Sequence, residues 1–407
     1  MIASEPNTSA DRPAPPHTIA PPATQHRRGP RGLAEDTSPG SPGQALAPRR
    51  RRSRLALWLR RGIERLFIRP KVEAFYRVLG GYTFFQLLHA AVELDLFTLL
   101  SQRGPMTHGQ IAEALGLEDR ATRVLLLGCT VLGLIKLRRG RYRNSLVAAR
   151  HLSRDSGTNI ISMVEWQHAI NYRPMFHLAD ALRANRNEGL AAIEGPGSTL
   201  FAKLANHPKL ETIFHRAMDE QSDNLARSFV EQLDFAGYRR VADVGGGNGA
   251  YLIEIARANP HLQGVVVDLP SVCELAAENI RSSGLADRLG TSPGDCFANE
   301  LPRDVDCFLF AHFLTLWSEA RNQQLLRDAY DALPEGGSVV IYNIMQEDSR
   351  SGPLSCAIGS TYFLAIATGE SLLWTWQEYC DWLTRAGFHK IVRRRLLRDH
   401  GVIIATK

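Results

Sequence analysis

The sequence lacks closely spaced cysteines, long apolar runs and an apolar signal-peptide core. Its six cysteines are scattered along 407 residues with no close pair, which argues against a disulfide framework and against a zinc site. No apolar run reaches the roughly 18 residues that a membrane-spanning helix needs. These absences predict a protein without a metal site that is located in the cytoplasm, a reducing compartment.

A basic excess is also absent from most of the chain. Residues 1–69 contain 13 arginines and 5 acidic residues, whereas the remaining residues contain 35 basic and 37 acidic side chains. The overall charge of +6 therefore comes from the N-terminal leader. It gives no ground for expecting a nucleic-acid partner.

The leader is rich in proline and poor in aromatic residues. Residues 1–48 hold ten of the 21 prolines and no aromatic residue, so they cannot bury enough surface to offset the entropy of ordering. We expect residues 1–70 to be a disordered leader with a basic amphipathic helix at 54–67. Such a helix suits weak contact with a membrane surface, docking on the protein's own domain, or an organelle transit signal.

Residues 71–235 have the apolar periodicity of helices. The stretch 84–97 is apolar on nearly every face, which is typical of a helix buried in a core or between subunits. Two further helices, 107–116 and 119–137, precede a basic hairpin at 138–143, and this order is a winged-helix outline. The second of these helices offers few side chains that could read base edges, so we expect the module to serve packing rather than DNA binding.

From Arg240 onward, short apolar strands alternate with amphipathic helices, which is typical of an open parallel α/β sheet. Two closing strands, 389–396 and 401–406, have no helix between them and should pair as an antiparallel hairpin. The other expected strands lie near 240–244, 264–268, 305–311 and 338–344, and the expected helices near 249–258, 271–283, 319–333 and 376–386.

The most informative stretch is Asp243-Val-Gly-Gly-Gly-Asn-Gly249, where a strand runs through glycines into a helix. Gly245 and Gly247 let the backbone approach a ligand closely, and Asp268 at the end of the next strand can accept both hydroxyls of a ribose. An acid two residues before the first glycine suits an ammonium group better than a pyrophosphate. Together with Asp295, which can bind an adenine amino group, it favours S-adenosylmethionine over a dinucleotide.

From about Lys71 to the end, the chain resembles the dimeric S-adenosylmethionine-dependent small-molecule O-methyltransferases of the plant caffeate and bacterial acetylserotonin and anthracycline type. The resemblance rests on the glycine motif, on Val266-Val-Asp-Leu-Pro270 and on Gly294-Asp-Cys-Phe297. It implies a winged-helix-like dimerisation domain at 71–235 and a Rossmann-like, seven-stranded methyltransferase domain at 236–407. It also implies a homodimer and a small-molecule acceptor from secondary metabolism.

The resemblance also implies which residues hold the methyl donor. The segment Phe214-His-Arg-Ala-Met218 is similar to the family segment that closes over the methionine end of the donor. The residues assigned to donor binding in this way are Met218, Ser222, Asp243, Gly245, Gly247, Asp268, Leu269, Asp295, Cys296 and Phe297.

The catalytic positions depart from the family pattern. After the fourth strand the family has His-Asp-Trp, whose histidine removes the acceptor's hydroxyl proton, whereas this chain has Thr315-Leu-Trp317. At the end of the next strand, Asn343 replaces a glutamate of the family. A second, later glutamate of the family is replaced by Leu372 or Leu373. Where the family has a basic residue that helps to hold the donor, this chain has Ala311. Because a threonine hydroxyl is no base near neutral pH, the deprotonating groups are missing while the donor half is kept.

Methyl transfer without that base is open in two forms. An enol, a pyrrole or an electron-rich ring can attack through carbon and lose its proton afterwards, while an acidic enol or phenol arrives already ionised. The bacteriochlorophyllide C-methyltransferases, which this chain resembles here, also lack the histidine. O-methylation and C-methylation both stay open, as do a catalytically inactive cofactor-binding protein and a winged-helix regulator.

Three side chains are weak candidates for catalysis: His168 in the helical region, His312 beside the vacated position, and Thr315 itself. Weaker candidates are Tyr172, Arg173 and His177. An aromatic set is consistent with a planar or long apolar acceptor: Phe310, Phe313, Trp317, Tyr362, Phe363 and Trp374.

Overall fold

The computed structural model describes Glu64 and residues 68–407. Apart from Glu64 and residues 68–70, the leader, with its predicted disorder and its predicted helix at 54–67, lies outside the described residues. The chain divides into two units, residues 1–70 and 71–407, and all the described strands belong to the second. The fold and the candidate site are therefore features of residues 71–407.

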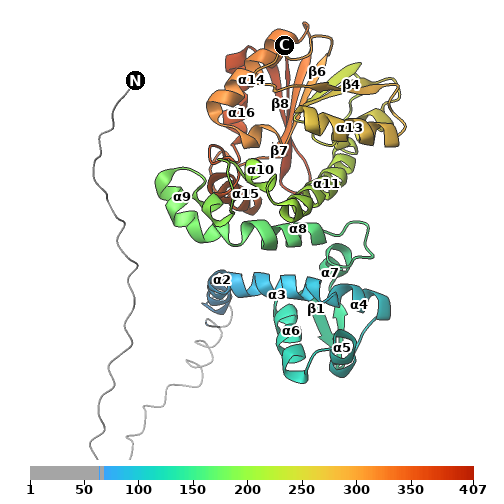
Figure 1. The fold of residues 1–407 in the computed structure, drawn as a ribbon, viewed down its shortest axis with the longest axis vertical. Coiled ribbons are helices and arrows are strands. Elements are labelled where there is room, and N and C mark those ends of the chain that lie inside the picture. The colour runs from blue at the N-terminus through green and yellow to red at the C-terminus, as the bar shows by residue number, and fades with distance from the viewer. Residues whose placement is uncertain (1–63, 65–67) are drawn as a thin grey trace, which may run out of the picture. The chain divides into compact units, whose positions relative to one another are not determined.

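The first part of this unit has the predicted winged-helix order (Figure 1). Its elements are α2 (Arg69–Leu79), α3 (Gly81–Glu93), α4 (Leu96–Arg103), α5 (His108–Leu115), α6 (Asp119–Val131), β1 (Ile135–Arg138), β2 (Arg141–Asn144) and α7 (Leu146–His151). A capping box between Thr107 and Gln110 opens α5, and Gly116 in a left-handed conformation ends it. Strands β1 and β2 pair antiparallel, as the hairpin prediction requires.

Two expected helices are shorter than predicted. The apolar stretch 84–97 is divided at Asp95, whose φ of 57° separates α3 from α4. The helix expected at 119–137 ends at Val131, because Gly133 takes a φ of 73° and the chain enters β1. Apolar periodicity alone shows neither break.

No single described helix is long and apolar enough to cross a membrane. The pair α3 and α4 meets the requirements of length and composition only when taken together, and it is bent by 52°. Ala91, Leu96 and Phe97 of this pair are fully buried in the core of the winged-helix region.

A second helical run leads to the sheet. It comprises α8 (Ile161–Trp166), the π-helix η2 (Gln167–Asn171), η3 (Pro174–His177), α9 (Leu178–Ala184), η4 (Glu188–Ala192), α10 (Leu200–Leu204) and α11 (Pro208–Val230). Trp166, Ile170 and Phe214 share one apolar cluster with Ala365, which comes from a much later part of the chain. This cluster joins the helical run to the segment around Ala365.

The sheet has seven strands in the order β5-β4-β3-β6-β7-β9-β8. Its strands are β3 (Arg240–Val244), β4 (Gln263–Asp268), β5 (Leu289–Pro293), β6 (Cys307–Ala311), β7 (Ser338–Ile344), β8 (His389–Arg395) and β9 (His400–Thr406). Strands β3 to β7 run parallel to one another, and β9 pairs antiparallel with both β7 and β8. The predicted α/β class and closing hairpin are confirmed.

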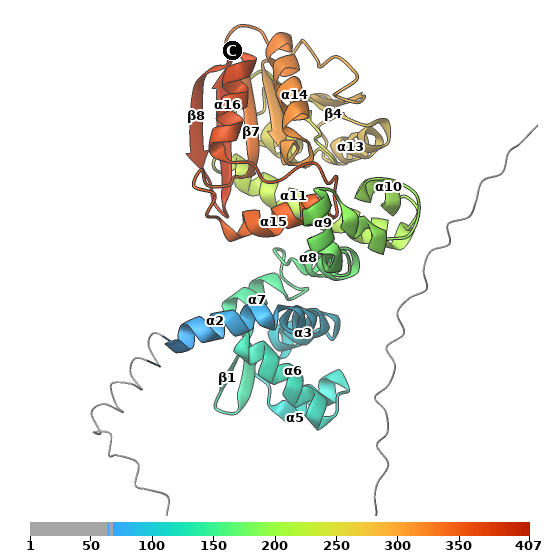
Figure 2. The same ribbon diagram turned by 90° about the vertical axis from the view of Figure 1, so that its left-hand side faces the viewer.

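Helices cover both faces of the sheet (Figure 1). The remaining helices are α12 (Ala250–Ala258), α13 (Pro270–Ser282), α14 (Glu319–Ala332), α15 (Leu354–Ala365) and α16 (Trp376–Ala386). Residues of α14 and α16 pack on one face, and residues of α11, α12 and α13 on the other. Helix α15 lies beside α9 (Figure 2). This arrangement leaves the carboxyl ends of the parallel strands for the site.

Candidate active site

The glycine loop between β3 and α12 presents bare backbone. Gly245 and Gly247 have φ angles of 68° and 57°, which favour glycine. A Cβ on Gly245 would clash with the ring of Phe313, and one on Gly246 would lie 2.8 Å from the carboxyl carbon of Asp243. The loop therefore has both the conformation and the close contacts that exclude side chains, at the sheet edge where open α/β sheets bind ligands.

Asp243 is a buried acid without a partner. Its side chain is fully buried, and among the described residues neither carboxyl oxygen has a hydrogen-bond partner. Burial, and then the neighbouring Asp268 carboxylate, raise the pKa of Asp243 to about 8. A buried carboxyl group with two vacant oxygens fits a cationic ligand group, such as the ammonium of the expected donor.

Asp268 ends β4 directly beside the glycine loop. Its Oδ2 accepts the backbone N–H of Gly247 at 3.0 Å, and its Oδ1 accepts that of Leu269 at 2.7 Å. Burial raises the pKa of Asp268, and these two hydrogen bonds oppose that rise. Each oxygen keeps a lone pair that can accept from a ribose hydroxyl.

A corner of aromatic rings follows β5. The Oδ1 of Asp295 accepts the backbone N–H of Phe297 at 2.9 Å, and its Oδ2 has no partner among the described side chains and backbone groups. Phe297 packs edge-on against Trp317 with ring centroids 4.8 Å apart. Burial, followed by Asp295, raises the pKa of the Cys296 thiol to about 12 and keeps it neutral. Rings beside a free acceptor suit a purine with an amino group.

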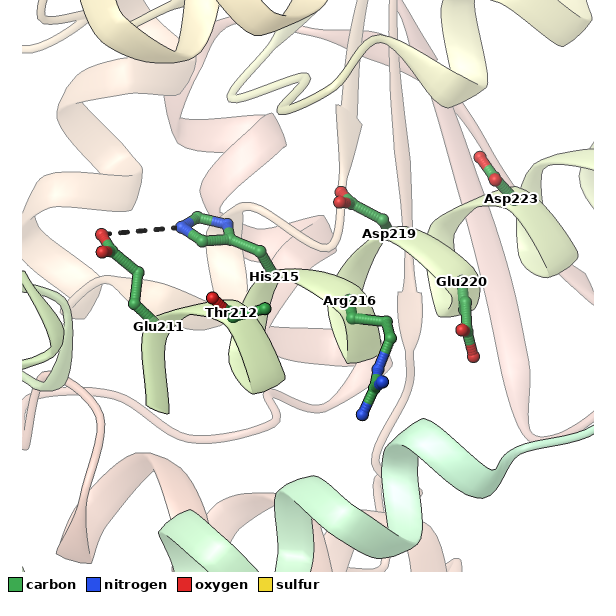
Figure 3. Close-up of a pocket in the computed structure, with 7 residues that line it drawn as sticks. All are labelled: Glu211, Thr212, His215, Arg216, Asp219, Glu220 and Asp223. Carbon is green, nitrogen blue, oxygen red and sulfur yellow. Dashed lines mark ion pairs between the residues drawn. The ribbon is translucent and has the colours of Figure 1, made fainter. Parts of the chain in front are cut away.

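Helix α11 is joined to the glycine loop by a hydrogen bond between Asp219 and Asn248, two residues to which the sequence analysis gave no role. The side-chain amide of Asn248 donates to Oδ1 of Asp219 at 3.0 Å, and burial raises the pKa of Asp219. Figure 3 shows Asp219 and Asp223 on one side of the helix and Arg216 on another, along an open hollow of about 530 Å³. The available signal was the asparagine within the glycine motif.

The two residues of α11 that the resemblance assigned to the donor lie in different surroundings. Met218 packs against the apolar cluster that contains Trp166 and Phe214. Ser222 is half-buried, one turn further along the helix. The structure thus brings Asp243, Gly245, Gly247, Asp268 and Leu269 together, while a donor role for Met218 and Ser222 stays a prediction.

Thr315 occupies a short helical turn, η5 (Leu314–Leu316), after β6. Its side chain is 2% exposed, and its hydroxyl donates to the backbone carbonyl of His312 at 3.0 Å. This bond helps to hold the turn, and because an alkyl hydroxyl is far too weak a base to take a proton near neutral pH, Thr315 does not replace the family's histidine. The two positions where the family has glutamates also lack an acid. At one of them the amide of Asn343 donates to the Tyr379 hydroxyl at 3.1 Å, and at the other Leu373 is buried.

His312 packs among other rings behind the turn. Its ring centroid lies 5.1 Å from those of Tyr342 and His400. Burial, and then His400, lower the pKa of His312 to about 3. The imidazole is therefore neutral and a weak base at neutral pH.

His168 lies on the π-helix η2 and stacks on His89 of α3, with ring centroids 3.6 Å apart and planes 12° from parallel. The hydroxyl of Tyr172 donates to the backbone carbonyl of Tyr82 at 3.3 Å. Arg173 is exposed and His177 is half-buried. The structure does not bring these groups together with Thr315 through any hydrogen bond of the described residues.

Members of the aromatic set lie in two apolar clusters. Phe310 is fully buried in the sheet core, so it packs the core and does not belong to the set that could contact an acceptor. Strand alternation explains this, because Phe308 and Phe310 share one face of β6. Tyr362 instead contacts Trp166, with ring centroids 5.2 Å apart, in the cluster beyond the sheet.

No group of three or more metal-ligating side chains occurs among residues 68–407 or at Glu64.

A model of the O-methyltransferase domain matches residues 175–389, and one of the O-methyltransferase dimerisation domain matches residues 76–154. The chain belongs to the O-methyltransferase family. It is an S-adenosylmethionine-dependent methyltransferase of small molecules, and the buried Asp243, Asp268 beside the glycine loop and the aromatic corner fit that donor.

Relatives of this methyltransferase include carbon-methylating and oxygen-methylating enzymes. The L-tyrosine C(3)-methyltransferase of Streptomyces lavendulae is 37% identical over 334 residues, which are 81% of this chain and 91% of the relative. The 3-hydroxy-5-methyl-1-naphthoate 3-O-methyltransferase of Streptomyces sahachiroi is 36% identical over 324 residues, 79% and 91% of the two chains.

Solved structures have the same fold. The S-adenosylmethionine-dependent methyltransferase SibL in its apo form superposes with a TM-score of 0.76 at 37% identity, over 82% of this chain and 98% of that one. Human N-acetylserotonin methyltransferase in complex with S-adenosylmethionine gives a TM-score of 0.71 at 27% identity, over 83% and 97%.

Proposed function

We propose that this methyltransferase acts on a small phenolic acceptor that needs no protein base before it attacks, and that the nucleophile is a ring carbon. The observation that carries the proposal is the buried Thr315 at the position of the family's base, where a hydroxyl that donates to the carbonyl of His312 stands in place of an imidazole. The relatives named for tyrosine and for a hydroxynaphthoate support an aromatic, hydroxyl-bearing acceptor.

The chain's own residues would hold the donor along the carboxyl edge of the sheet. In this proposal Asp243 pairs with the ammonium, Asp268 accepts the ribose hydroxyls, and Asp295 accepts the adenine amino group. The donor supplies an electrophilic methyl group on a sulfonium. The bare backbone at Gly245 and Gly247 lets it lie close to the loop.

Catalysis then depends mainly on positioning, since bringing nucleophile and methyl together can supply much of the acceleration. With the donor held by Asp243, Asp268 and Asp295, a ring carbon would take the methyl group that the sulfonium supplies, and the electron pair of the carbon–sulfur bond would stay on sulfur. The ring carbon finally loses its proton to water, which restores aromaticity. No side chain needs to take a proton before the bond forms, and this agrees with the pKa of about 3 at His312.

The second candidate is O-methylation of a phenol that is ionised in solution, favoured by the naphthoate 3-O-methyltransferase relative. Ring-deuterated phenolic acids and amino acids separate the two reactions, because C-methylation loses one ring deuteron and O-methylation keeps all of them. Mass spectrometry of the products reads both the added methyl group and the retained deuterium. A product that keeps all its ring deuterium would overturn C-methylation.

The same assay tests the inactive alternative. Calorimetric binding of S-adenosylhomocysteine without turnover of any phenolic acceptor would favour a cofactor-binding protein over an enzyme.

We propose further that the protein is a homodimer. Helix α2 has no buried residue and exposes a row of apolar side chains: Val72, Phe75, Tyr76, Val78 and Leu79. Exposed apolar surface of this kind favours a protein partner, and a dimerisation-domain match begins within α2, at residue 76. Light scattering should find a dimer at micromolar concentration, and Phe75→Glu should shift it toward monomer.

The domain division at 235 and 236, a cytoplasmic location and weak membrane contact by the leader also remain proposals. A reducing compartment is supported by the cysteines, all six of which are free. Fractionation of cells that express the full chain, with and without residues 1–70, tests both the location and the membrane contact.

A further inference from the structure

The loop Ala367–Ser371, between α15 and α16, is bonded to two separate parts of the molecule. We call these five residues the clasp. On one side the clasp bonds to the η5 turn that carries Thr315. On the other side it bonds to the helical segment 187–204, which contains η4 and α10. No catalytic or donor-binding position assigned above lies within it.

The clasp is hydrogen-bonded to the η5 turn through two side-chain hydroxyl groups. The Thr368 hydroxyl donates to the backbone carbonyl of Leu316 at 2.8 Å. The Ser371 hydroxyl donates to the backbone carbonyl of Thr315, and both of these residues are buried. Two successive carbonyls of the turn are therefore held by one loop, at the position where the family's histidine is replaced.

The other side of the clasp is fixed to the helical segment. The backbone carbonyl of Ala367 accepts from the side-chain amide of Asn187 at 3.1 Å and from the backbone N–H of Leu200 at 3.3 Å. Gly369 has a φ of 75°, and a Cβ there would lie 2.6 Å from the backbone nitrogen of Asn187. This contact leaves room only for glycine, so the clasp lies directly against Asn187.

A third link reaches the aromatic corner. Glu370 of the clasp forms an ion pair with Arg321 of α14 at 4.0 Å. The guanidinium of Arg321 lies 5.1 Å from the ring centroid of Phe297 and 5.0 Å from that of Trp317. These are the rings proposed to hold the adenine, and an arginine at this distance is attracted to their faces.

We infer that the clasp is a positioning segment that transmits donor occupancy to the helical segment 187–204. A donor that fixes Phe297 and Trp317 also fixes Arg321 and the η5 turn, and through the clasp it orders Asn187 and Leu200. The acceptor would then meet a preformed wall instead of having to order it. The inference rests on the proposed placement of the adenine beside Phe297 and Trp317.

Hydrogen exchange with S-adenosylhomocysteine as the probe tests this coupling without any acceptor. In the full-length protein, the ligand should slow amide exchange within residues 187–204. The double variant Thr368→Val, Ser371→Ala should lose most of that ligand-dependent protection, because each hydrogen bond is worth roughly 3- to 10-fold in an equilibrium constant. Its affinity for the ligand, measured by calorimetry, should change by less than about 3-fold, since neither hydroxyl is proposed to touch the donor.

Matched controls remove hydroxyl–carbonyl bonds outside the clasp. Thr384 donates to the carbonyl of Cys380 at 2.9 Å and Ser283 to that of Ile280 at 2.7 Å, so Thr384→Val, Ser283→Ala should keep the full protection. The conservative pair Thr368→Ser, Ser371→Thr keeps both hydroxyls and should also keep it. This pair separates lost coupling from a general loss of folding.

Three outcomes would overturn the inference. Full protection of residues 187–204 in the double variant would show that the clasp does not transmit occupancy. Absence of protection in the unmodified protein, despite binding, would show that there is nothing to transmit. Failure of the unmodified protein to bind the ligand would refute the donor-site proposal itself, so the two failures are distinguishable.

Discussion

Gly246 lies directly against the carboxyl group of Asp243. A Cβ at residue 246 would stand 2.8 Å from both the carboxyl carbon and Oδ2 of Asp243. Unlike its neighbours Gly245 and Gly247, Gly246 has no positive φ, so its backbone would accept a side chain. The steric requirement at this position therefore comes from the unpartnered acid.

Gly246→Ala should weaken donor binding by about 5- to 150-fold, the range that corresponds to the roughly 1–3 kcal/mol cost of overpacking a close contact. Calorimetric titration with S-adenosylhomocysteine measures it. Gly290→Ala is the matched control, because Gly290 has no positive φ and no atom within 4 Å of the position of an added Cβ. Equal affinities for the two variants would contradict the role given to Asp243.

Donor binding should release a proton from Asp243. With a pKa of about 8, this acid is mainly protonated at pH 7, whereas pairing with an ammonium requires the carboxylate. Binding at pH 7 should therefore release close to one proton, and affinity should fall by up to about tenfold per pH unit below pH 8. Calorimetry in two buffers of different ionisation enthalpy counts the protons, and Asp243→Asn should abolish the release.

The same acid should make the donor-free protein less stable at neutral pH. An unfolded aspartate has a pKa of about 3.9, so between about pH 4 and pH 8 the folded state holds a proton that the unfolded state has lost. The free energy of unfolding should fall as the pH rises through this window and level off above it. Thermal denaturation of the wild type and Asp243→Asn over this range gives the difference, and parallel pH profiles would contradict the prediction.

Asp268→Ala should cost about 1.5–3 kcal/mol of donor affinity, which is typical of hydrogen bonds to a charged group. The loss has two sources, since the carboxylate faces the proposed ribose site and also holds the N–H groups of Gly247 and Leu269. Asp295→Ala should cost less, because Asp295 lies at an exposed corner. Unchanged affinity of both variants in a calorimetric titration would refute the assignment of the ribose and adenine sites.

The parts of the site that follow from local sequence were predictable. Apolar strands ending at Val244 and Asp268, with glycines between strand and helix, require the loop and the second acid to meet at one sheet edge. The contact between Asp219 and Asn248 was not predictable, because it depends on how α11 packs against the sheet. The stack of His168 on His89 likewise depends on tertiary packing, together with a π-helix that apolar periodicity does not reveal.

Burial also decided which predicted groups can act. Local sequence placed His312 beside the vacated base position, but only the packing of Tyr342 and His400 around it shows why its imidazole stays neutral. The clasp has no sequence signature, since ordinary threonine and serine residues form its bonds to the η5 turn. Long-range contacts of this kind become visible only in the folded chain.

Thr315→Val tests the absence of a base most directly. The change removes the hydroxyl that donates to the carbonyl of His312 and keeps the side-chain shape. If the acceptor attacks without prior deprotonation by the protein, kcat should fall by less than about tenfold, whereas losing a true general base typically costs 10²–10⁴-fold. His168→Gln, measured on the same acceptor, should be equally mild, and the pH profile of kcat should show no essential base near pH 6–7 in either protein. A collapse of kcat in Thr315→Val with unchanged affinity for S-adenosylhomocysteine would contradict the absence of a base and mean that the threonine takes part in the chemistry.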